Sequence, residues 1–338
     1  MKIIRFLFLL IPVTIGIPFM TSCGESTTDV PADSIQVTDT LASLNDSIRK
    51  DPNNLDLYHQ RALYYMTKND LASAQMDINR VLALDSSNVK YLMTGADIHF
   101  FLNKIQRADQ LLKRAVEVEP DNIECLLKMA QLHFYLKRYD EEIAVLDKVI
   151  EKDKRNAQAF FMRGMVAKEK GDTAKAMSEM QIATQMDPDY YNAYIQMGVI
   201  SASQGNPVAV DYYRNALEIQ PLSIEALYNL GMYYQDHGDP RLAINTYLSI
   251  LQLNPMHFDA HFNLGYVYTF EVDSPAVAVN YFDLAIRDNP SSARAYWGRG
   301  RCFEEMGDVN KASADYVQAL KIDPQFDAAA AGLDRLKK

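Results

Sequence analysis

The 338-residue sequence predicts an all-α fold in which pairs of helices stack into a solenoid. Apolar residues follow the 3.6-residue helical period, and similar motifs return about every 34 residues. Such a repeat is one helical pair that cannot bury its apolar face alone, so neighbouring pairs must stack. Small residues recur at spacings of 34, 34, 34, 34, 33, 34 and 35: Ala62, Ala96, Ala130, Gly164, Gly198, Gly231, Gly265 and Gly300. The repeats close mostly on proline: Pro52, Ser86, Pro120, Lys154, Pro188, Pro221, Pro255, Pro290 and Pro324.

Composition indicates a folded, acidic chain. Apolar residues make up 48%, with only 14 Gly and 13 Pro, which excludes a low-complexity sequence. The net charge is −10; without residues 1–22, which contain Lys2 and Arg5, 32 basic residues face 44 acidic ones, giving −12. An acidic surface repels nucleic acid and anionic headgroups, so we expect neither as a ligand. Basic or neutral protein partners remain open.

The N-terminus has the features of an export signal. Lys2 and Arg5 open the chain, and residues 6–24 carry no charge. This run approaches the roughly 20 residues of a transmembrane helix, which is the competing interpretation. Pro12, Pro18 and the polar end of the run instead favour a secretory signal peptide.

The residues around Cys23 resemble the lipobox of bacterial lipoproteins. Thr21 and Ser22 fit that pattern, whereas Met20 stands where leucine is usual. The resemblance implies a lipoprotein signal peptide over residues 1–22 and lipid attachment at Cys23; ordinary cleavage nearby is the alternative. Gly24, rather than Asp, is similar to lipoproteins sent to the outer membrane. This implies a lipid-anchored envelope protein, with its solenoid in the periplasm or at the cell surface.

Four further segments follow in order. Residues 23–38 are polar and predict a flexible tether; residues 24–37 reach at most about 50 Å when extended. Residues 39–54 predict a single orphan helix, and residues 327–338 predict a polar capping helix. Eight repeats occupy residues 55–326, with these bounds: 55–88, 89–122, 123–156, 157–190, 191–223, 224–257, 258–292 and 293–326.

The repeat resembles the tetratricopeptide repeat. Residues 225–255 carry its signature in Leu227, Leu230, Gly231, Tyr234, Ala243, Tyr247 and Pro255. The resemblance covers about 300 residues. It implies a right-handed superhelix of about eight helix–turn–helix repeats that holds partner proteins. One departure is Glu142, which replaces the small residue of the second helix, so its carboxylate must reach solvent or find a partner.

The same resemblance locates a candidate peptide groove on the first helix of each pair. Asn229 and Asn263 resemble the groove residues that hold a peptide backbone, and we expect both to face solvent. The lysine–asparagine–arginine set that clamps chaperone tails is not found, which disfavours such tails. The alternative is that the apolar candidates only fill the interior. The groove candidates are Tyr228, Asn229, Met232, Phe262, Asn263, Tyr266 and Trp297, and the wider inner face adds Met66, Met93, Phe100, Phe101, Leu127, Phe134, Tyr135, Phe161, Met165 and Phe270.

Catalytic, cofactor and metal motifs are not found in the sequence, so we expect no enzyme activity, cofactor or bound metal. His99 and His133 occupy equivalent positions in adjacent repeats and are expected in or near the core. Cys125 and Cys302 lie in the third and eighth repeats. A disulfide needs Cα atoms within about 7 Å, so both are expected to be buried free thiols.

These observations favour a non-catalytic scaffold or adaptor lipoprotein of the bacterial envelope, which binds peptides or helical segments of partner proteins. Two alternatives remain open. A glycan or small molecule could stack on Trp297 and the tyrosines of the inner face. The chain could also be an accessory subunit of a larger envelope enzyme or assembly complex.

Overall fold

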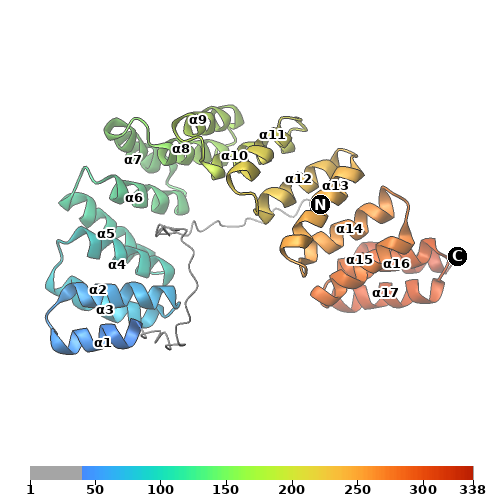
Figure 1. Ribbon diagram of the computed structural model, residues 1–338, viewed down its shortest axis with the longest axis horizontal. Coiled ribbons are helices and arrows are strands. Elements are labelled where there is room, and N and C mark those ends of the chain that lie inside the picture. The colour runs from blue at the N-terminus through green and yellow to red at the C-terminus, as the bar shows by residue number, and fades with distance from the viewer. Residues whose placement is uncertain (1–39, 338) are drawn as a thin grey trace, which may run out of the picture. The chain divides into compact units, whose positions relative to one another are not determined.

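The computed structural model describes residues 40–337, which form eighteen helices and no strand (Figure 1). The all-α prediction is confirmed. No helix within this range is both long and apolar enough to cross a membrane. Residues 1–39, and with them the predicted signal peptide, tether and Cys23, lie outside the described residues.

The chain divides into two units, Met1–Asn53 and Asn54–Lys338. The first contains α1 (Thr40–Lys50), and the second contains eight helical pairs followed by α18 (Asp327–Leu336). The first helices of the pairs, here the A row, are α2 (Leu55–Thr67), α4 (Val89–Phe101), α6 (Ile123–Tyr135), α8 (Ala157–Glu169), α10 (Tyr191–Ser203), α12 (Ile224–Asp236), α14 (Phe258–Phe270) and α16 (Ala293–Glu305). The second helices, here the B row, are α3 (Leu71–Leu84), α5 (Ile105–Val118), α7 (Tyr139–Lys152), α9 (Thr173–Met186), α11 (Ala209–Ile219), α13 (Pro240–Leu253), α15 (Pro275–Asp288) and α17 (Val309–Ile322).

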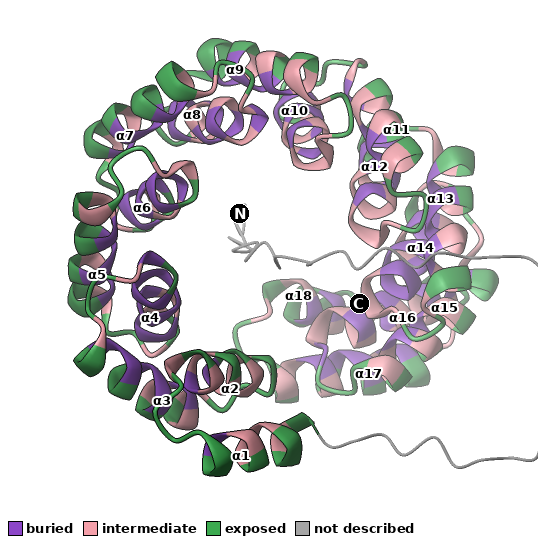
Figure 2. Ribbon diagram, turned by 60° about the vertical axis from the view of Figure 1, so that its left-hand side comes forward, coloured by how far each residue is buried: buried purple, intermediate pink, exposed green. Residues whose placement is uncertain are grey.

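Each A-row helix packs on the B-row helix that follows it, and that helix packs on the next A-row helix. Figure 2 shows α4, α6, α8, α10 and α12 along one side of the array and α5, α7, α9 and α11 along the other. The main contacts therefore join each repeat to its neighbours, as expected of a quasi-one-dimensional stack.

Polar side chains at the turns define where helices begin. Asp172 and Asp239 each accept a hydrogen bond from the backbone N–H three residues later, at the starts of α9 and α13. These carboxylates satisfy donors that the first helical turn leaves free. Before α13, Gly238 has φ 71°, a left-handed conformation that glycine adopts at little cost.

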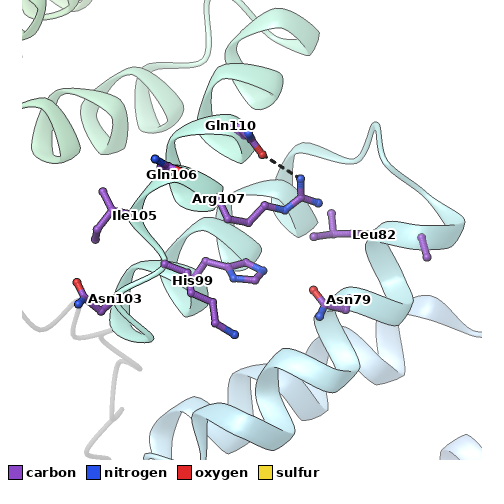
Figure 3. Close-up of a pocket in the computed structure, with 10 residues that line it drawn as sticks. Asn79, Leu82, His99, Asn103, Ile105, Gln106, Arg107 and Gln110 are labelled. Carbon is purple, nitrogen blue, oxygen red and sulfur yellow. Dashed lines mark hydrogen bonds between the residues drawn. The ribbon is translucent and has the colours of Figure 1, made fainter.

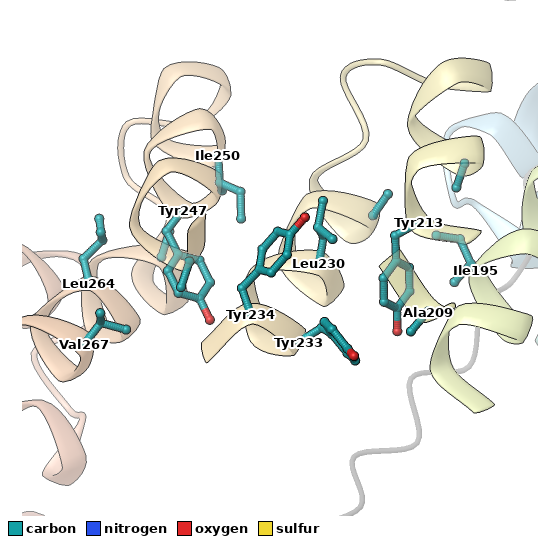
Figure 4. Packing of buried hydrophobic residues seen from close by; sticks show 14 residues of the cluster. Ile195, Ala209, Tyr213, Leu230, Tyr233, Tyr234, Tyr247, Ile250, Leu264 and Val267 are labelled. Carbon is teal, nitrogen blue, oxygen red and sulfur yellow. The ribbon is translucent and has the colours of Figure 1, made fainter. Parts of the chain in front are cut away.

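The recurring small residues make room for large side chains of the B row. A Cβ on Gly231 would lie 2.7 Å from Tyr247 Cε1, and one on Gly198 would lie 2.4 Å from Tyr213 Cε1. Both tyrosine rings are buried within one cluster (Figure 4). Where alanine replaces glycine, in the first three repeats, the corresponding B-row residues are the smaller Ile78, Leu112 and Leu146. Residue size is thus matched between the two helices of a repeat.

We expect Gly231→Leu to lower the free energy of unfolding by about 1–3 kcal/mol, because the new side chain would overlap the Tyr247 ring. Amide exchange should rise first in α12 and α13, the pair that the substitution separates. Hydrogen–deuterium exchange resolved by peptide measures this directly. A uniform rise through all eight repeats would contradict the nearest-neighbour description of the stack.

An ion pair recurs at equivalent positions in three repeats, and the sequence analysis did not predict it. Arg299 Nε donates to Asp315 Oδ2 at 2.8 Å, and its Nη2 donates to Asp315 Oδ1 at 2.7 Å. Arg61–Asp77 and Arg163–Glu179 join equivalent positions at 2.7 and 2.8 Å. In each case the arginine is 16 residues before the acid, so the pair ties an A-row helix to its own B-row partner.

Glu142 differs from the prediction. Its side chain neither reaches solvent nor finds a partner: the residue is 0% exposed, and neither carboxylate oxygen has a hydrogen-bond partner. A buried carboxyl group without a partner is more stable in its neutral, protonated form. Burial raises the pKa of Glu142 to about 9, so the acid remains protonated at neutral pH.

The predictions for the cysteines and histidines are confirmed. Cys125 and Cys302 are buried free thiols. Burial raises the pKa of each thiol to about 11, which leaves them poor nucleophiles at neutral pH. His99 and His133 are both 4% exposed.

Candidate functional site

The seven groove candidates lie on three successive A-row helices. Tyr228, Asn229 and Met232 are on α12; Phe262, Asn263 and Tyr266 are on α14; Trp297 is on α16. Helical periodicity places Tyr228 and Met232, which are four residues apart, on one face of α12. The same spacing relates Phe262 to Tyr266 and places both on one face of α14.

Four aromatic rings form a continuous row, here the aromatic ladder: Tyr266, Phe270, Trp297 and Phe326. The Tyr266 and Phe270 centroids are 4.6 Å apart, and Phe270 stacks on Trp297 at 5.8 Å with an interplanar angle of 19°. Trp297 meets Phe326 edge-on at 6.2 Å. Phe270 is 39% exposed and the other three are half-buried. The ladder therefore joins α14, α16 and the start of α18 through partly exposed apolar rings.

Tyr228 and Met232 extend the apolar face toward α12. Both are half-buried. The Tyr228 ring centroid lies 6.3 Å from that of His257 and 6.4 Å from that of Tyr247. These contacts fix one side of Tyr228 while the residue stays partly open.

The expected exposure of Asn263 is wrong. Asn263 is 6% exposed, and its Nδ2 donates to Met232 Sδ at 3.4 Å. The amide also lies near the buried Tyr247, whose hydroxyl donates to Gln235 Oε1 at 2.9 Å. Its helical position directs it to the preceding repeat, where it packs between α14 and the earlier pair. Asn229 is half-buried, so only one of the two asparagines retains access to solvent.

Phe262 is also more enclosed than a groove residue should be. It is 9% exposed, and its ring meets Phe282 edge-on at 5.7 Å. The Arg294 guanidinium lies 4.5 Å from the Phe262 centroid and covers that ring through a cation–π contact. Arg294 in turn pairs with Asp259. Phe262 is therefore a buried residue that packs against Phe282 and Arg294, and it is not part of the exposed groove surface.

Charged side chains beside the ladder are paired with one another. Arg335 donates to both carboxylate oxygens of Glu304 at 2.8 and 2.9 Å, and Arg301 donates to Glu304 at 3.0 Å. The Arg335 hydrogen bonds are the main cause that lowers the pKa of Glu304 to about 2. Since Arg301 also donates to Glu305 at 2.8 Å, this rim is largely neutralised, and the ladder remains as the open apolar surface.

Phe326 and Arg294 were absent from the sequence-based set. Phe326 lies just before α18, where the repeat pattern ends. A comparison of equivalent positions in the repeats could therefore not identify it. Arg294 precedes Trp297 by three residues, and its part in covering Phe262 depends on a contact between repeats. Among residues 40–337, no group of three or more His, Cys, Asp or Glu side chains is placed to hold a metal ion.

Family models match separate parts of the chain. Tetratricopeptide-repeat models match residues 127–191, 228–269 and 293–326. A model described as anaphase-promoting complex, cyclosome, subunit 3 matches residues 67–149.

Curated relatives match a short stretch. Photosystem I assembly protein Ycf3 of Acaryochloris marina (strain MBIC 11017) is 34% identical over 89 residues, covering 25% of this chain and 54% of the relative. The Ycf3 of Cyanophora paradoxa is 29% identical over 89 residues, covering 25% and 51%. The chain thus spans about half the length of the curated relatives it matches.

Solved structures share the fold. The C-terminal part of a repeat-containing protein from Cytophaga hutchinsonii has a TM-score of 0.60 at 20% identity, covering 73% of this chain and 99% of that one. A chain of the anaphase-promoting complex hetero-tetramer Cut9–Hcn1 has a TM-score of 0.51 at 16% identity, covering 89% and 60%. Together with the helical pairs, these likenesses confirm the tetratricopeptide-type α-solenoid.

Proposed function

We propose that this protein is a non-catalytic scaffold that binds peptide or helical segments of partner proteins on the A-row face around the aromatic ladder. The observation that carries the proposal is the ladder itself, whose partly exposed rings lie next to one another on α14, α16 and the start of α18. Proteins of this fold typically mediate contacts between proteins, and both curated relatives are named as photosystem I assembly proteins.

Rigid rings at this spacing suit an amphipathic helix. Aromatic side chains bring large apolar area at little conformational cost, and an amphipathic helix presents apolar side chains every three or four residues. Exposed Phe270, with half-buried Tyr266 and Met232, offers a mixed aromatic and thioether surface that adapts to such side chains. A glycan would need open ring faces, but Phe270 stacks on one face of Trp297, which favours the peptide.

The envelope setting is part of the same proposal. The basic start, the uncharged run and the Thr21–Ser22–Cys23 sequence support an exported protein that is lipid-anchored through Cys23 to the outer membrane. There the scaffold would assemble a complex of envelope proteins. An accessory role within a larger envelope enzyme fits the same face and the same anchor.

Binding of selected peptides tests the face. Peptides chosen from a displayed library on the purified protein should bind Phe270→Ala about tenfold more weakly, because truncating an aromatic anchor typically costs at least 1–2 kcal/mol of binding. The melting temperature should change little, since Phe270 is 39% exposed. Fluorescence anisotropy gives the dissociation constants.

Val317→Ala is the matched control, because Val317 is 54% exposed on the B-row helix α17. It should bind the selected peptides like the wild type. Equal affinities for all three proteins would place the binding surface elsewhere.

A further inference from the structure

An open pocket of about 900 Å³ lies between α3, the end of α4 and the start of α5 (Figure 3). The chain carries a net charge of −10, yet none of the ten residues that line this pocket is acidic. The polar lining is formed by Lys104, Arg107, His99 and four side-chain amides, those of Asn79, Asn103, Gln106 and Gln110.

His99 is the most unusual member of the lining. It is 4% exposed, and neither ring nitrogen has a hydrogen-bond partner. Figure 3 shows its ring directed into the space between Arg107 and Asn79. Burial, with the charges of Arg107 and Lys104, lowers the pKa of His99. A buried polar group left without a partner is destabilising, so an occupant that accepts from this imidazole would be stabilised.

The start of α5 lacks the negatively charged cap that four other B-row helices have. At the equivalent position of other B-row helices, Asp70, Asp172, Asp239 and Asp308 accept hydrogen bonds from first-turn N–H groups. Here the residue is Lys104, whose side chain makes no capping hydrogen bond, and the Arg107 N–H at the equivalent position bonds to the Lys104 carbonyl at 3.0 Å. The Lys104 ammonium donates to Gln75 at 3.0 Å. The first turn of a helix carries partial positive charge, which favours an anion. A carboxylate from outside the chain would supply the negative charge that the aspartates provide at those four helices.

The corresponding site one repeat later shows what this one lacks. There Arg138 replaces Lys104 and His133 replaces His99. The His133 ring nitrogens also lack hydrogen-bond partners. Two internal carboxylates nevertheless lie in that site: Glu141 is 3.7 Å from His133 Nε2 and 3.9 Å from Arg138, and Asp109 is 4.0 Å from Arg138. The equivalents of Glu141 and Asp109 in the first site, 34 residues earlier, are Arg107 and Gln75. Two negative charges present in one site are thus replaced by one positive charge and one neutral group in the other.

We propose that the pocket around His99, Lys104 and Arg107 binds a carboxylate of an acidic peptide segment of a partner protein. The cations and the uncapped turn would hold the carboxylate. The surrounding amides of Asn79, Asn103, Gln106 and Gln110 each provide donors and an acceptor, as a peptide backbone requires. The volume also exceeds what a single ion fills, since a water molecule occupies about 30 Å³. The aromatic ladder lies several repeats away in sequence, so either site can fail without the other.

Histidine resonances test this pocket in the whole protein. The probes are the capped peptide acetyl-Gly-Glu-Glu-Gly-amide, acetate and inorganic phosphate, each titrated at low ionic strength into ¹⁵N-histidine-labelled protein. We expect the peptide to shift the His99 ring signals along a saturable curve and to bind more tightly than acetate or phosphate. The His133 signals should stay unchanged, because that site holds its own carboxylates.

Two variants sharpen the result. Arg107→Glu reproduces the neighbouring site and should weaken peptide binding by about tenfold to a hundredfold, the loss expected for a charge-assisted hydrogen bond. Arg107 is exposed, so circular dichroism should confirm an unchanged fold. Lys148→Glu, an exposed change of the same charge on α7, should bind like the wild type. Conversely, Glu141→Arg with Asp109→Gln should make the His133 signals respond to the peptide.

Three outcomes would overturn the proposal. The His99 signals could remain unmoved by every probe, or Lys148→Glu could weaken binding as much as Arg107→Glu, which would reduce the effect to net charge. Phosphate or acetate binding at least as tightly as the peptide would make the pocket a site for free anions only.

Discussion

Phe282→Ala should destabilise the protein by about 3–5 kcal/mol, the usual cost of truncating a fully buried aromatic side chain. Phe282 is 0% exposed and is enclosed by two glycines of different repeats. A Cβ on Gly265 would lie 2.8 Å from Phe282 Cε1, and one on Gly298 would lie 2.5 Å from the same atom. Neither glycine has a side chain that could move into the vacated space, so the cavity would persist between the seventh and eighth repeats. Chemical denaturation followed by circular dichroism measures the loss.

Val277→Ala is the matched control on the same helix. Val277 is 41% exposed, and surface substitutions usually change stability by no more than about 0.5 kcal/mol. Amide exchange in Phe282→Ala should increase first in α14, α15 and α16. A loss of unfolding free energy below about 1 kcal/mol would contradict the idea that the Phe282 ring fills the space between two repeats. It would mean that the neighbouring residues close around the missing ring.

The second large effect is a pH-dependent gain of stability on replacing Glu142. Its pKa is raised from 4.5 to about 9 in the folded protein, so between these values the folded state holds a proton that the unfolded chain releases. The stability of the wild type should therefore fall as pH rises through this window, by about 1.4 kcal/mol per pH unit from this group. Over the 2.5 units between pH 4.5 and 7 this amounts to roughly 3 kcal/mol.

Glu142→Ala removes this dependence and places the residue that Ala74, Ala108 and Ala176 provide in other repeats. Unfolding free energies measured from pH 5 to 9 should show the variant gaining on the wild type as pH rises. Glu151→Ala, an exposed change on the same helix, should show no such gain. A difference between Glu142→Ala and wild type that is independent of pH would mean that the acid is charged and solvated in the folded protein.

The fold could be predicted from the sequence because the same pattern of residues recurs in every repeat. The small column of Gly198, Gly231 and Gly265 recurs with a large residue some 16 positions later, and only one packing serves all copies. The ion pairs of Arg61, Arg163 and Arg299 recur by the same logic and could have been found by searching for charges at that spacing.

The candidate site was predictable only in part, because side-chain direction depends on the neighbouring repeat. Asn263 and Asn229 occupy the same column, yet Asn263 is enclosed by Met232 and Tyr247, whereas Asn229 stays half-buried. The protonation state of Glu142 also depends on whether a partner lies nearby, and its position within the repeat does not reveal this. The aromatic ladder includes a contact across the last repeat boundary, because Phe326 lies beyond the end of the repeat pattern.

Site-specific photo-cross-linking tests the scaffold proposal most directly. A benzophenone amino acid placed at Phe270 would report on the ladder, and one placed at Val317 would report on the B row at similar exposure. Irradiation in living cells, followed by mass spectrometry of the linked peptides, identifies both the partner and the segment bound. The scaffold account expects one defined peptide segment linked at position 270, lost on Trp297→Ala, with none linked at position 317. Linking at position 317 alone, or equally at both positions, would contradict a binding face on the A row.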